Sequence, residues 1–340
     1  MKYKLMLYLH TLIFALLFTN CSVPFDYSDP LPSWNDGITK SSIIEFVNDI
    51  TDKNSPNFIK VNERIAVFDN DGTLWTEQPM YFQIQFVIDR IKEMAKDHPE
   101  WKYKQPYKSV IEDDINNLMS SGSEGIGELF LVTHTGMPTT EFYKIGSDWF
   151  DSASHPKFNK PFTDLVFQPM LELMNYLREN EFKTYIVSGG GQTFIRIISE
   201  QVYDIPPEQV IGTLFETEYK IIDGNPEILR LPKLFLFDDK EIKPVAIEKF
   251  IGRIPIMAFG NSDGDLQMLQ YTQSGKGKRL MALVHHTDDV REYAYDRNSN
   301  IGHLDKAWDE ATKNNWTLID MKNDWKVIYP FELGLKKNIL

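Results

Sequence analysis

The fold is decided by the stretch RIAVFDNDGTLW, residues 64–75. Its apolar run, 65–68, has the length and composition of a buried strand, and it ends at two carboxylates one residue apart, Asp69 and Asp71. At the carboxyl end of a parallel strand the backbone leaves the sheet and functional groups meet solvent. Two acids there repel each other unless a cation lies between them, and Mg²⁺ suits because it takes oxygen ligands and keeps room for phosphate. The stretch therefore predicts a metal-dependent site for phosphoryl transfer.

The amino-terminal residues 1–21 have the pattern of a signal peptide. Lys2 and Lys4 precede an apolar run over 5–18, which is too short for a membrane span. The run is followed by Cys21, which resembles the lipid-attachment cysteine of bacterial lipoproteins. We expect export to the periplasm or cell envelope, with Cys21 as the candidate lipid anchor; the alternative is a plain cleaved signal.

The composition excludes several classes of partner. There are 36 basic and 49 acidic residues, for a net charge of −13, and Cys21 is the single cysteine. No intrachain disulfide can form, so stability must come from the core. The acidity argues against nucleic acid and against an anionic membrane surface as partners, because both need basic patches. Contact with a membrane is expected only through the lipid anchor.

Hydrophobic periodicity divides the chain into a helical part and an alternating part. The segment 22–60 reads as a tether followed by a helix over 41–50, and no strand is expected between 76 and 161. Helices are predicted in that interval over 79–98, 107–119, 126–133 and 139–150. Beyond 168, helices are predicted over 170–178, 192–202, 243–250 and 265–271, and strands over 183–187, 215–222, 228–231, 254–259 and 280–284.

Strands that alternate with helices of this length predict an α/β fold with a doubly wound parallel sheet. In a simple unit the next parallel strand follows within roughly 30 residues, whereas the strand that starts at Lys183 lies much farther along the chain. The segment 76–164 is therefore expected to be an inserted helical cap that covers the site. The core would consist of 61–75 and 165–330, with a tail over 331–340.

Four motifs in order carry a resemblance to a known family. DNDGTL (69–74) resembles the first motif of the haloacid-dehalogenase-like hydrolase superfamily, in its phosphatase branch with phosphoserine and phosphorylcholine phosphatases. YIVSGG (185–190) resembles the second motif, Lys243 at a helix start resembles the third, and FGNSDGDLQML (259–269) resembles the fourth. The resemblance implies a Rossmann-like core with an inserted α-helical cap, Mg²⁺ as cofactor and a small phosphorylated substrate.

The residue chemistry assigns roles that agree with the resemblance. Asp69 is the candidate nucleophile, which would form an aspartyl-phosphate, and Asp71 is the candidate acid and base for the leaving oxygen and the attacking water. The dehalogenase branch lacks the second aspartate, so Asp71 favours phosphate substrates. The expected phosphate-binding residues carry hydroxyl, backbone amide or ammonium groups: Thr73, Ser188, Gly189 and Lys243. Lys240 is the alternative to Lys243.

The fourth motif departs from the family pattern. The family usually has an aspartate directly after the glycine, as a metal ligand, and this chain has Asn261. An amide oxygen coordinates Mg²⁺ without charge, so affinity should fall unless Asp263 or Asp265 compensates. The spacing leaves open whether Asn261 or Asp263 is the direct ligand. The predicted metal residues are Asp69, Asp71, Asn261, Asp263 and Asp265.

The cap contains aromatic residues and two polar candidates. The aromatics are expected to form the cap's own core, with a cage for a quaternary ammonium as the alternative. Glu77 is expected either to orient an amine-bearing substrate or to be a solvated acid, and His134 is expected to be structural. His285 and His286 are not expected to form a metal site, because no further ligands follow at a fixed spacing.

The sequence therefore predicts an exported Mg²⁺-dependent hydrolase of small phosphomonoesters. One alternative is a phosphotransferase or phosphomutase on the same residues, which would differ only in whether water reaches the intermediate. The other is a surface binding protein on a phosphatase scaffold that has lost catalysis, with Asn261 as the first sign. The retained set of Asp69, Asp71, Ser188 and Lys243 argues against that second alternative, because clustered like charges have no purpose in an unused site.

Overall fold

Strand β1 (Ile65–Phe68) lies in the middle of the sheet, and all four of its residues are buried. Ala66 and Phe68 join the hydrophobic cluster on one face of the sheet, and Ile65 and Val67 join the cluster on the other. A strand covered on both faces reads as a continuous apolar run rather than an alternating one, as in the sequence. On its two sides β1 pairs in parallel with β2 (Lys183–Gly191) and β5 (Met257–Gly260).

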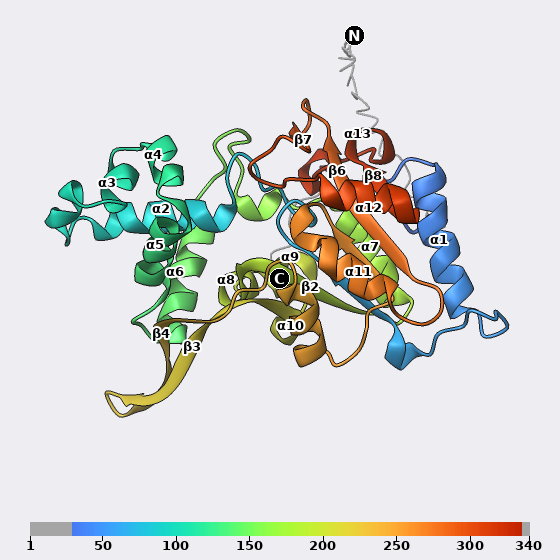
Figure 1. Cartoon of the computed structure of the whole chain (residues 1–340), viewed down its shortest axis with the longest axis horizontal. Coiled ribbons are helices and arrows are strands. Elements are labelled where there is room, and N and C mark those ends of the chain that lie inside the picture. Colours follow the sequence, from blue (N-terminus) through green and yellow to red (C-terminus); the bar gives the residue numbers. More distant parts are fainter. Residues whose placement is uncertain (1–28, 335–340) are drawn as a thin grey trace, which may run out of the picture.

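The computed structural model describes residues 29–334, which form an eight-stranded sheet (Figure 1). The strand order is β4-β3-β2-β1-β5-β6-β7, and β8 pairs with β6. Only the pairs β3–β4 and β6–β7 are antiparallel. This confirms the predicted α/β class with a mostly parallel sheet. The remaining strands are β3 (Val210–Ile222), β4 (Asn225–Leu236), β6 (Leu280–Thr287), β7 (Ala294–Tyr295) and β8 (Thr317–Asp320).

Helices cover both faces of the sheet, as a doubly wound fold requires. Helices α1 (Ile38–Thr51) and α7 (Gln168–Glu179) bury their apolar residues in the Phe68 cluster. Helices α10 (Ile242–Phe250), α11 (Leu266–Gln273) and α12 (Lys306–Asn314) bury theirs in the Val67 cluster. The short helices are α8 (Gln192–Arg196), α9 (Ser199–Tyr203) and α13 (Met321–Asp324).

Between β1 and α7 the chain is helical, as predicted, and these helices form the group at one end of the molecule in Figure 1. They are α2 (Phe82–Met94), α3 (Tyr107–Ile111), α4 (Ile115–Ser120), α5 (Gly122–His134) and α6 (Thr139–Ser152). The helix predicted over 107–119 is split because Asp113 has a φ of 57°, in the left-handed region that interrupts a helix. The cap boundaries at 76 and 164 stay a prediction.

The hairpin of β3 and β4 is much longer than predicted. The first residues of β3 pair in parallel with β2, and the rest leaves the sheet and pairs with β4 as a projecting ribbon (Figure 1). The helix predicted over 192–202 is in fact α8 and α9. Beyond the last predicted strand the core continues with β7, α12, β8 and α13.

The predicted signal peptide, Cys21 and most of the carboxyl-terminal tail lie outside the described residues. Within 29–334, no helix is long and apolar enough to cross a membrane.

Candidate active site

Asp69 follows directly after β1, at the carboxyl edge of the sheet. Its backbone amide donates to Phe259 O in β5 at 2.9 Å, which fixes the residue between two parallel strands. Its side chain accepts a hydrogen bond from Lys243 Nζ at 2.6 Å through Oδ1. Burial raises the pKa of Asp69 well above its ordinary value, and the charge of Asp265 adds to the shift while Lys243 opposes it. The candidate nucleophile is thus held by a cation in a buried cluster of acids.

Lys243 lies at the start of α10 and joins two motifs. Its Nζ is 2.6 Å from Asp69 Oδ1 and 2.6 Å from Asp265 Oδ1. Burial alone would lower the pKa of Lys243, but the two carboxylates raise it above the ordinary lysine value, so the side chain is a cation. Lys240 is exposed. The structure therefore brings Lys243, the preferred of the two lysines, to the predicted nucleophile.

Asp71 lies one turn of the loop away, beside the second motif. Its Oδ1 accepts from Trp75 Nε1 at 2.7 Å. A Cβ built on Gly190 would be 3.5 Å from Asp71 Oδ2 and 3.3 Å from Ser188 Oγ, so Asp71 and Ser188 face the same glycine. Burial raises the pKa of Asp71 to about 6, against the opposing hydrogen bond from Trp75 and the charge of Lys243.

In the second motif, backbone groups that the sequence predicts to be free for an anion form hydrogen bonds within the protein. Strand β2 continues through the glycines to Gly191, and Ser188 Oγ accepts from Gly190 N at 3.1 Å. Gly189 O accepts from the hydroxyl of Thr213 at 2.7 Å, and Gly191 N donates to Gln83 Oε1, in α2, at 2.7 Å. The amides of Gly190 and Gly191 thus already have partners within the protein, and the expected anion-binding turn is partly closed.

Asn261, at the end of β5, contacts Glu77 and Thr73. Its Nδ2 donates to Glu77 Oε1 at 2.6 Å, and its Oδ1 accepts from Thr73 Oγ1 at 3.3 Å. Gly72 has a φ of +72°, and a Cβ there would lie 2.0 Å from Asn261 Nδ2 and 2.4 Å from Glu77 Oε1. The turn after Asp71 must therefore be glycine both for its backbone conformation and for the two side chains above it.

Glu77 is a site residue whose place the sequence did not reveal. Its carboxylate is buried, so its interpretation as a solvated acid is wrong. Besides Asn261 it accepts from Tyr295 Oη at 2.8 Å. Burial, with the charges of Asp71 and Asp69, raises the pKa of Glu77 well above its ordinary value. The sequence held one sign of this role: the family pattern has an acid where this chain has Asn261, so another carboxylate is expected nearby.

Asp265 holds the fourth motif together. Its Oδ1 accepts from Lys243, and its Oδ2 accepts from the backbone amides of Asn261 at 3.0 Å and Ser262 at 3.1 Å. A Cβ on Gly260 would be 2.4 Å from Asp265 Cβ, which explains the glycine before Asn261. Both carboxylate oxygens are engaged, so the geometry gives Asp265 a positioning role rather than that of a direct metal ligand.

Asp263 is directed away from the other acids. Its Oδ1 accepts from the backbone amides of Asp305 and Ala307, both at 2.9 Å, at the start of α12. An acid that satisfies the first amides of a helix is a common capping arrangement. Of the two residues left open by the sequence, the structure places Asn261 beside Glu77 and Thr73 and uses Asp263 Oδ1 to hold α12. Which of the two binds a metal directly stays a prediction.

The donor set fits a hard divalent cation by its chemistry. Asn261 and Glu77 lie against the turn at Gly72, and the charges of Asp71 and Asp69 act on Glu77. Carboxylate and amide oxygens, which these residues carry, are what Mg²⁺ binds in proteins. Within residues 29–334, no three acidic, histidine or cysteine side chains are already grouped closely enough to hold a metal ion. Part of the ligand sphere would therefore have to come from the Asn261 amide, water and substrate phosphate.

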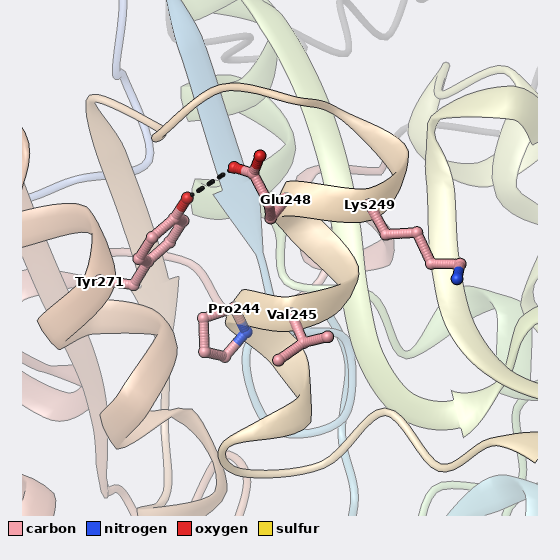
Figure 2. Close-up of a pocket in the computed structure, with 5 residues that line it drawn as sticks. All are labelled: Pro244, Val245, Glu248, Lys249 and Tyr271. Carbon is pink, nitrogen blue, oxygen red and sulfur yellow. Dashed lines mark hydrogen bonds between the residues drawn. The ribbon is translucent and has the colours of Figure 1, made fainter.

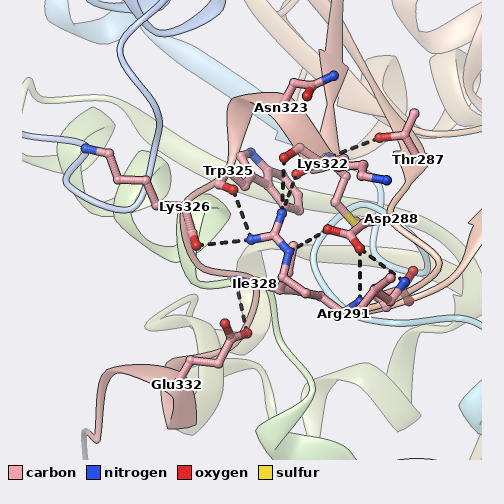
Figure 3. Close-up of polar contacts among 12 residues, drawn as sticks. Thr287, Asp288, Arg291, Lys322, Asn323, Trp325, Lys326, Ile328 and Glu332 are labelled. Atoms are coloured by element: carbon pink, nitrogen blue, oxygen red, sulfur yellow. Dashed lines mark hydrogen bonds and ion pairs between the residues drawn. The ribbon is translucent and has the colours of Figure 1, made fainter.

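Polar residues from the later part of the chain support the turn at Gly72. His286 Nε2 donates to Gly72 O at 2.7 Å, and the other ring nitrogen is 3.2 Å from Glu292 Oε2. The loop that carries Glu292 is anchored by Arg291, whose guanidinium donates to Trp325 O at 3.1 Å and to Lys326 O at 3.0 Å (Figure 3). The carboxyl-terminal segment thus fixes the loop on which the site's first turn rests.

The cap aromatics nearest the site pack on one another. Phe82 lies 4.7 Å from Trp75 and 4.5 Å from Phe162 between ring centroids, and Phe150 lies 4.8 Å from Phe194. Trp75, Phe82 and Phe150 are all buried. These contacts agree with the packing interpretation. His134 is also buried, as expected for a structural histidine.

A pocket on the outer side of α10 is separate from this cluster. It is lined by Pro244, Val245, Glu248, Lys249 and Tyr271, and Glu248 accepts from Tyr271 Oη at 3.0 Å (Figure 2). Pro244 directly follows Lys243 of the third motif, and the other four residues lie outside the motifs. The pocket therefore does not form part of the candidate site.

Comparison with known proteins supplies a family and distant structural likenesses, among them two proteins of unknown function. A conserved protein of unknown function from Anaerococcus prevotii is 18% identical over 73% of this chain and 86% of its own, with a TM-score of 0.45. A protein of unknown function from Bordetella pertussis is 12% identical over 76% of this chain and 99% of its own, with a TM-score of 0.48. These scores are too low to say anything about this chain's function, and no curated protein matches it.

The family model is decisive where the individual likenesses are not. The match runs over residues 66–270, from β1 to α11, and so includes all four motifs and the helices between the first and second. This span is more than half of the chain. The chain belongs to the haloacid dehalogenase-like hydrolase family.

Proposed function

We propose that this hydrolase cleaves small phosphomonoesters through an aspartyl-phosphate on Asp69, with Mg²⁺ as cofactor. The observation that carries the proposal is the state of Asp69. Its Oδ1 is held by Lys243, while no hydrogen bond formed within residues 29–334 uses its Oδ2. This carboxylate is fixed at one oxygen and free at the other, and it lies where the parallel strands end at their carboxyl termini. It is therefore arranged for attack on phosphorus.

The proposed reaction has two steps. In the first, Asp69 Oδ2 attacks phosphorus, the bond from phosphorus to the ester oxygen breaks, and Asp71 gives a proton to that oxygen. In the second, Asp71 takes a proton from water, the water oxygen attacks phosphorus, and Asp69 is released with inorganic phosphate. Asp71 lies two residues beyond the nucleophile and faces the Ser188 loop.

The remaining residues bind the phosphoryl group and the cofactor. Lys243, as a buried cation beside Asp69, neutralises charge on the phosphoryl oxygens. Ser188 offers its hydroxyl from the neighbouring strand end. Asp69, Asp71 and Asn261 would hold Mg²⁺, which when bound supplies positive charge to the transferring phosphoryl group. The preference for phosphate over a carbon–halogen bond rests on Asp71.

The test is turnover of a panel of phosphate esters with and without Mg²⁺, using the Asp69→Asn variant. Because the amide is not nucleophilic, we expect Asp69→Asn to remove turnover while the circular dichroism spectrum stays that of the unchanged protein. Asp289→Asn makes the same chemical change at an exposed position and serves as the matched control. Undiminished hydrolysis by Asp69→Asn, or by protein treated with a chelator, would disprove the mechanism.

Export is the second part of the proposal. It is supported by the lysines and apolar run over 1–18 and by the position of Cys21. An exported enzyme would meet its phosphate esters in the cell envelope.

A further inference from the structure

We propose that Glu77 supplies the divalent cation with the negative charge that Asn261 does not. The inference rests on the proposed function, because it assigns a further residue to the same metal site. Glu77 would then be a metal-binding residue of this chain. The carboxylate that the family pattern has at position 261 would not be lost but would come from position 77 instead.

The first argument is the state of the Glu77 carboxylate. Oε1 accepts from Asn261 Nδ2 at 2.6 Å and from Tyr295 Oη at 2.8 Å. No hydrogen bond among residues 29–334 uses Oε2, although the side chain is only 2% exposed. Oε2 is therefore the oxygen of this nearly enclosed side chain that remains available to a ligand, and coordination of a cation would use it.

The second argument is the backbone around it. A Cβ on Gly72 would lie 2.4 Å from Glu77 Oε1, and a Cβ on Gly302 would lie 2.0 Å from the same atom. Both glycines have positive φ, +72° and +66°, and they come from opposite ends of the chain. Two separate turns are thus shaped to leave room for one carboxylate beside the predicted nucleophile.

The third argument is the charge balance. Three buried acids, Asp69, Glu77 and Asp265, and the partly buried Asp71 lie near one buried cation, and Lys243 forms ion pairs with Asp69 and Asp265 only. Among the described residues, Asp71 and Glu77 have no cationic partner. When both carboxyl groups are ionised their negative charges repel each other, and a divalent cation would offset both charges.

The fourth argument is the orientation of the Asn261 amide. Since a carboxylate accepts and cannot donate, Glu77 fixes the NH₂ end of Asn261 toward itself. The amide oxygen is then the end turned to Thr73, at 3.3 Å, and keeps a lone pair for a cation. Glu77 therefore both adds charge and selects the neutral oxygen ligand.

The experiment is direct binding of Mn²⁺, as the probe for the Mg²⁺ site, measured by calorimetry on the full chain without substrate. We expect Glu77→Gln to raise the Kd for Mn²⁺ about 10- to 100-fold, the range for removing a group that supports a metal site. Glu124→Gln, the same change at an exposed position in the cap, should leave the Kd unchanged. The double variant Glu77→Gln with Asn261→Asp exchanges the amide and the carboxylate, so it should bring the Kd back close to its original value.

Each other outcome has a definite meaning. If Glu77→Gln binds Mn²⁺ as tightly as the unchanged protein, Glu77 is a neutral acid that only holds Asn261, and the inference is wrong. If that variant does not fold, Tyr295→Phe removes one hydrogen bond to Glu77 Oε1 while keeping the charge, and it should change the Kd for Mn²⁺. An unchanged Kd in Tyr295→Phe would then overturn the inference.

The two proposals fail separately. An unchanged protein that hydrolyses phosphate esters only with Mg²⁺, combined with an unaffected Glu77→Gln Kd, removes the role of Glu77 and leaves the function. An unchanged protein that binds Mn²⁺ with the expected Glu77 effect but turns over no phosphate ester removes the function and leaves the metal site. If the protein without substitutions binds no divalent cation, both the role of Glu77 and the requirement for Mg²⁺ are rejected.

Discussion

Asn261 shows how one residue can mislead when it is taken alone. In the sequence it stands where the family pattern has an aspartate, and the nearest acids along the chain are Asp263 and Asp265. In the structure those two hold α12 and Lys243, and the acid beside Asn261 is Glu77, which is far away in sequence. Spacing within a motif predicts neighbours along the chain, but here the contact joins the start of the cap to the fourth motif, after β5.

Gly72 is the residue whose substitution should disturb this arrangement most directly. We expect Gly72→Ala to lower the free energy of unfolding by about 2–4 kcal/mol, from the left-handed backbone and from a Cβ that meets Asn261 and Glu77. Turnover should fall as well, because Asn261 has to move. Denaturant unfolding and steady-state turnover of phosphate esters measure the two effects.

Gly277 provides the control for Gly72→Ala. It also has a positive φ, +82°, but a Cβ there would have nothing within 4 Å. Gly277→Ala should therefore show only the backbone penalty, about 1–2 kcal/mol, with full turnover. Equal losses of stability in the two variants, with turnover retained in both, would contradict the crowding at Gly72.

At the scale of elements, a chain of hydrogen bonds joins two cap helices to the second motif. Gly191 N donates to Gln83 Oε1, and Gln83 Nε2 donates to His134 Nε2 at 2.9 Å, which links β2, α2 and α5. The donor end of Gln83 faces His134, so the imidazole nitrogen must accept and the ring must be neutral. Burial, with the charge of Arg230, lowers the pKa of His134 to about 3.

This link makes the stability of the cap sensitive to acid. The pKa of His134 falls from 6.5 in the unfolded chain to about 3 in the folded one, so between these values the unfolded state binds more protons and stability rises with pH. From pH 7 to pH 5 the His134 contribution should remove about 2 kcal/mol of unfolding free energy. In His134→Gln that part of the pH dependence should disappear, as measured by denaturant unfolding at both pH values.

His98→Gln is the matched control, because His98 lies in the same cap with a half-exposed side chain. It should keep the pH dependence of the unchanged protein. A His134→Gln variant with the same loss between pH 7 and pH 5 as the unchanged protein would show that His134 is not the group responsible.

The elements were predictable where packing alone determines them. The buried run at β1, the parallel strands and the helices that cover them follow from apolar periodicity, since each needs a continuous or 3.6-residue pattern. The hairpin of β3 and β4 was underestimated because its outer half leaves the sheet and exposes residues such as Tyr219 and Ile221, which removes the burial pattern. Two-residue β7 is too short to have any pattern.

At the scale of the whole molecule, the sequence predicted the motif residues of the site but not the residues from other segments that contact them. Asp69, Lys243 and Asp265 come together as three motifs meet at one sheet edge, and strand order makes that foreseeable. Glu77 was a candidate without a definite role, and the contacts of Tyr295 and His286 could not be foreseen, because these residues reach the site from β7 and β6. No local spacing rule connects those segments.

Export can be tested on the whole chain in a bacterial host. We expect the unchanged protein to fractionate with membranes through a lipid on Cys21, and Cys21→Ser to appear in the soluble periplasmic fraction. Immunoblots of the fractions, with mass spectrometry of the amino terminus, measure the distribution. The same soluble distribution for both proteins would leave a plain cleaved signal, and retention of both in the cytoplasm would contradict export.

The bond from His286 to the carbonyl of Gly72 bears on what counts as a self-sufficient unit of this protein. The family match ends at residue 270, whereas His286, Glu292, Tyr295 and their Arg291 anchor all lie beyond it. A chain shortened to the matched part could keep every recognisable motif and yet lack the support of the turn at Gly72. We therefore expect the smallest piece of this protein that folds on its own to extend beyond the part that the family model matches.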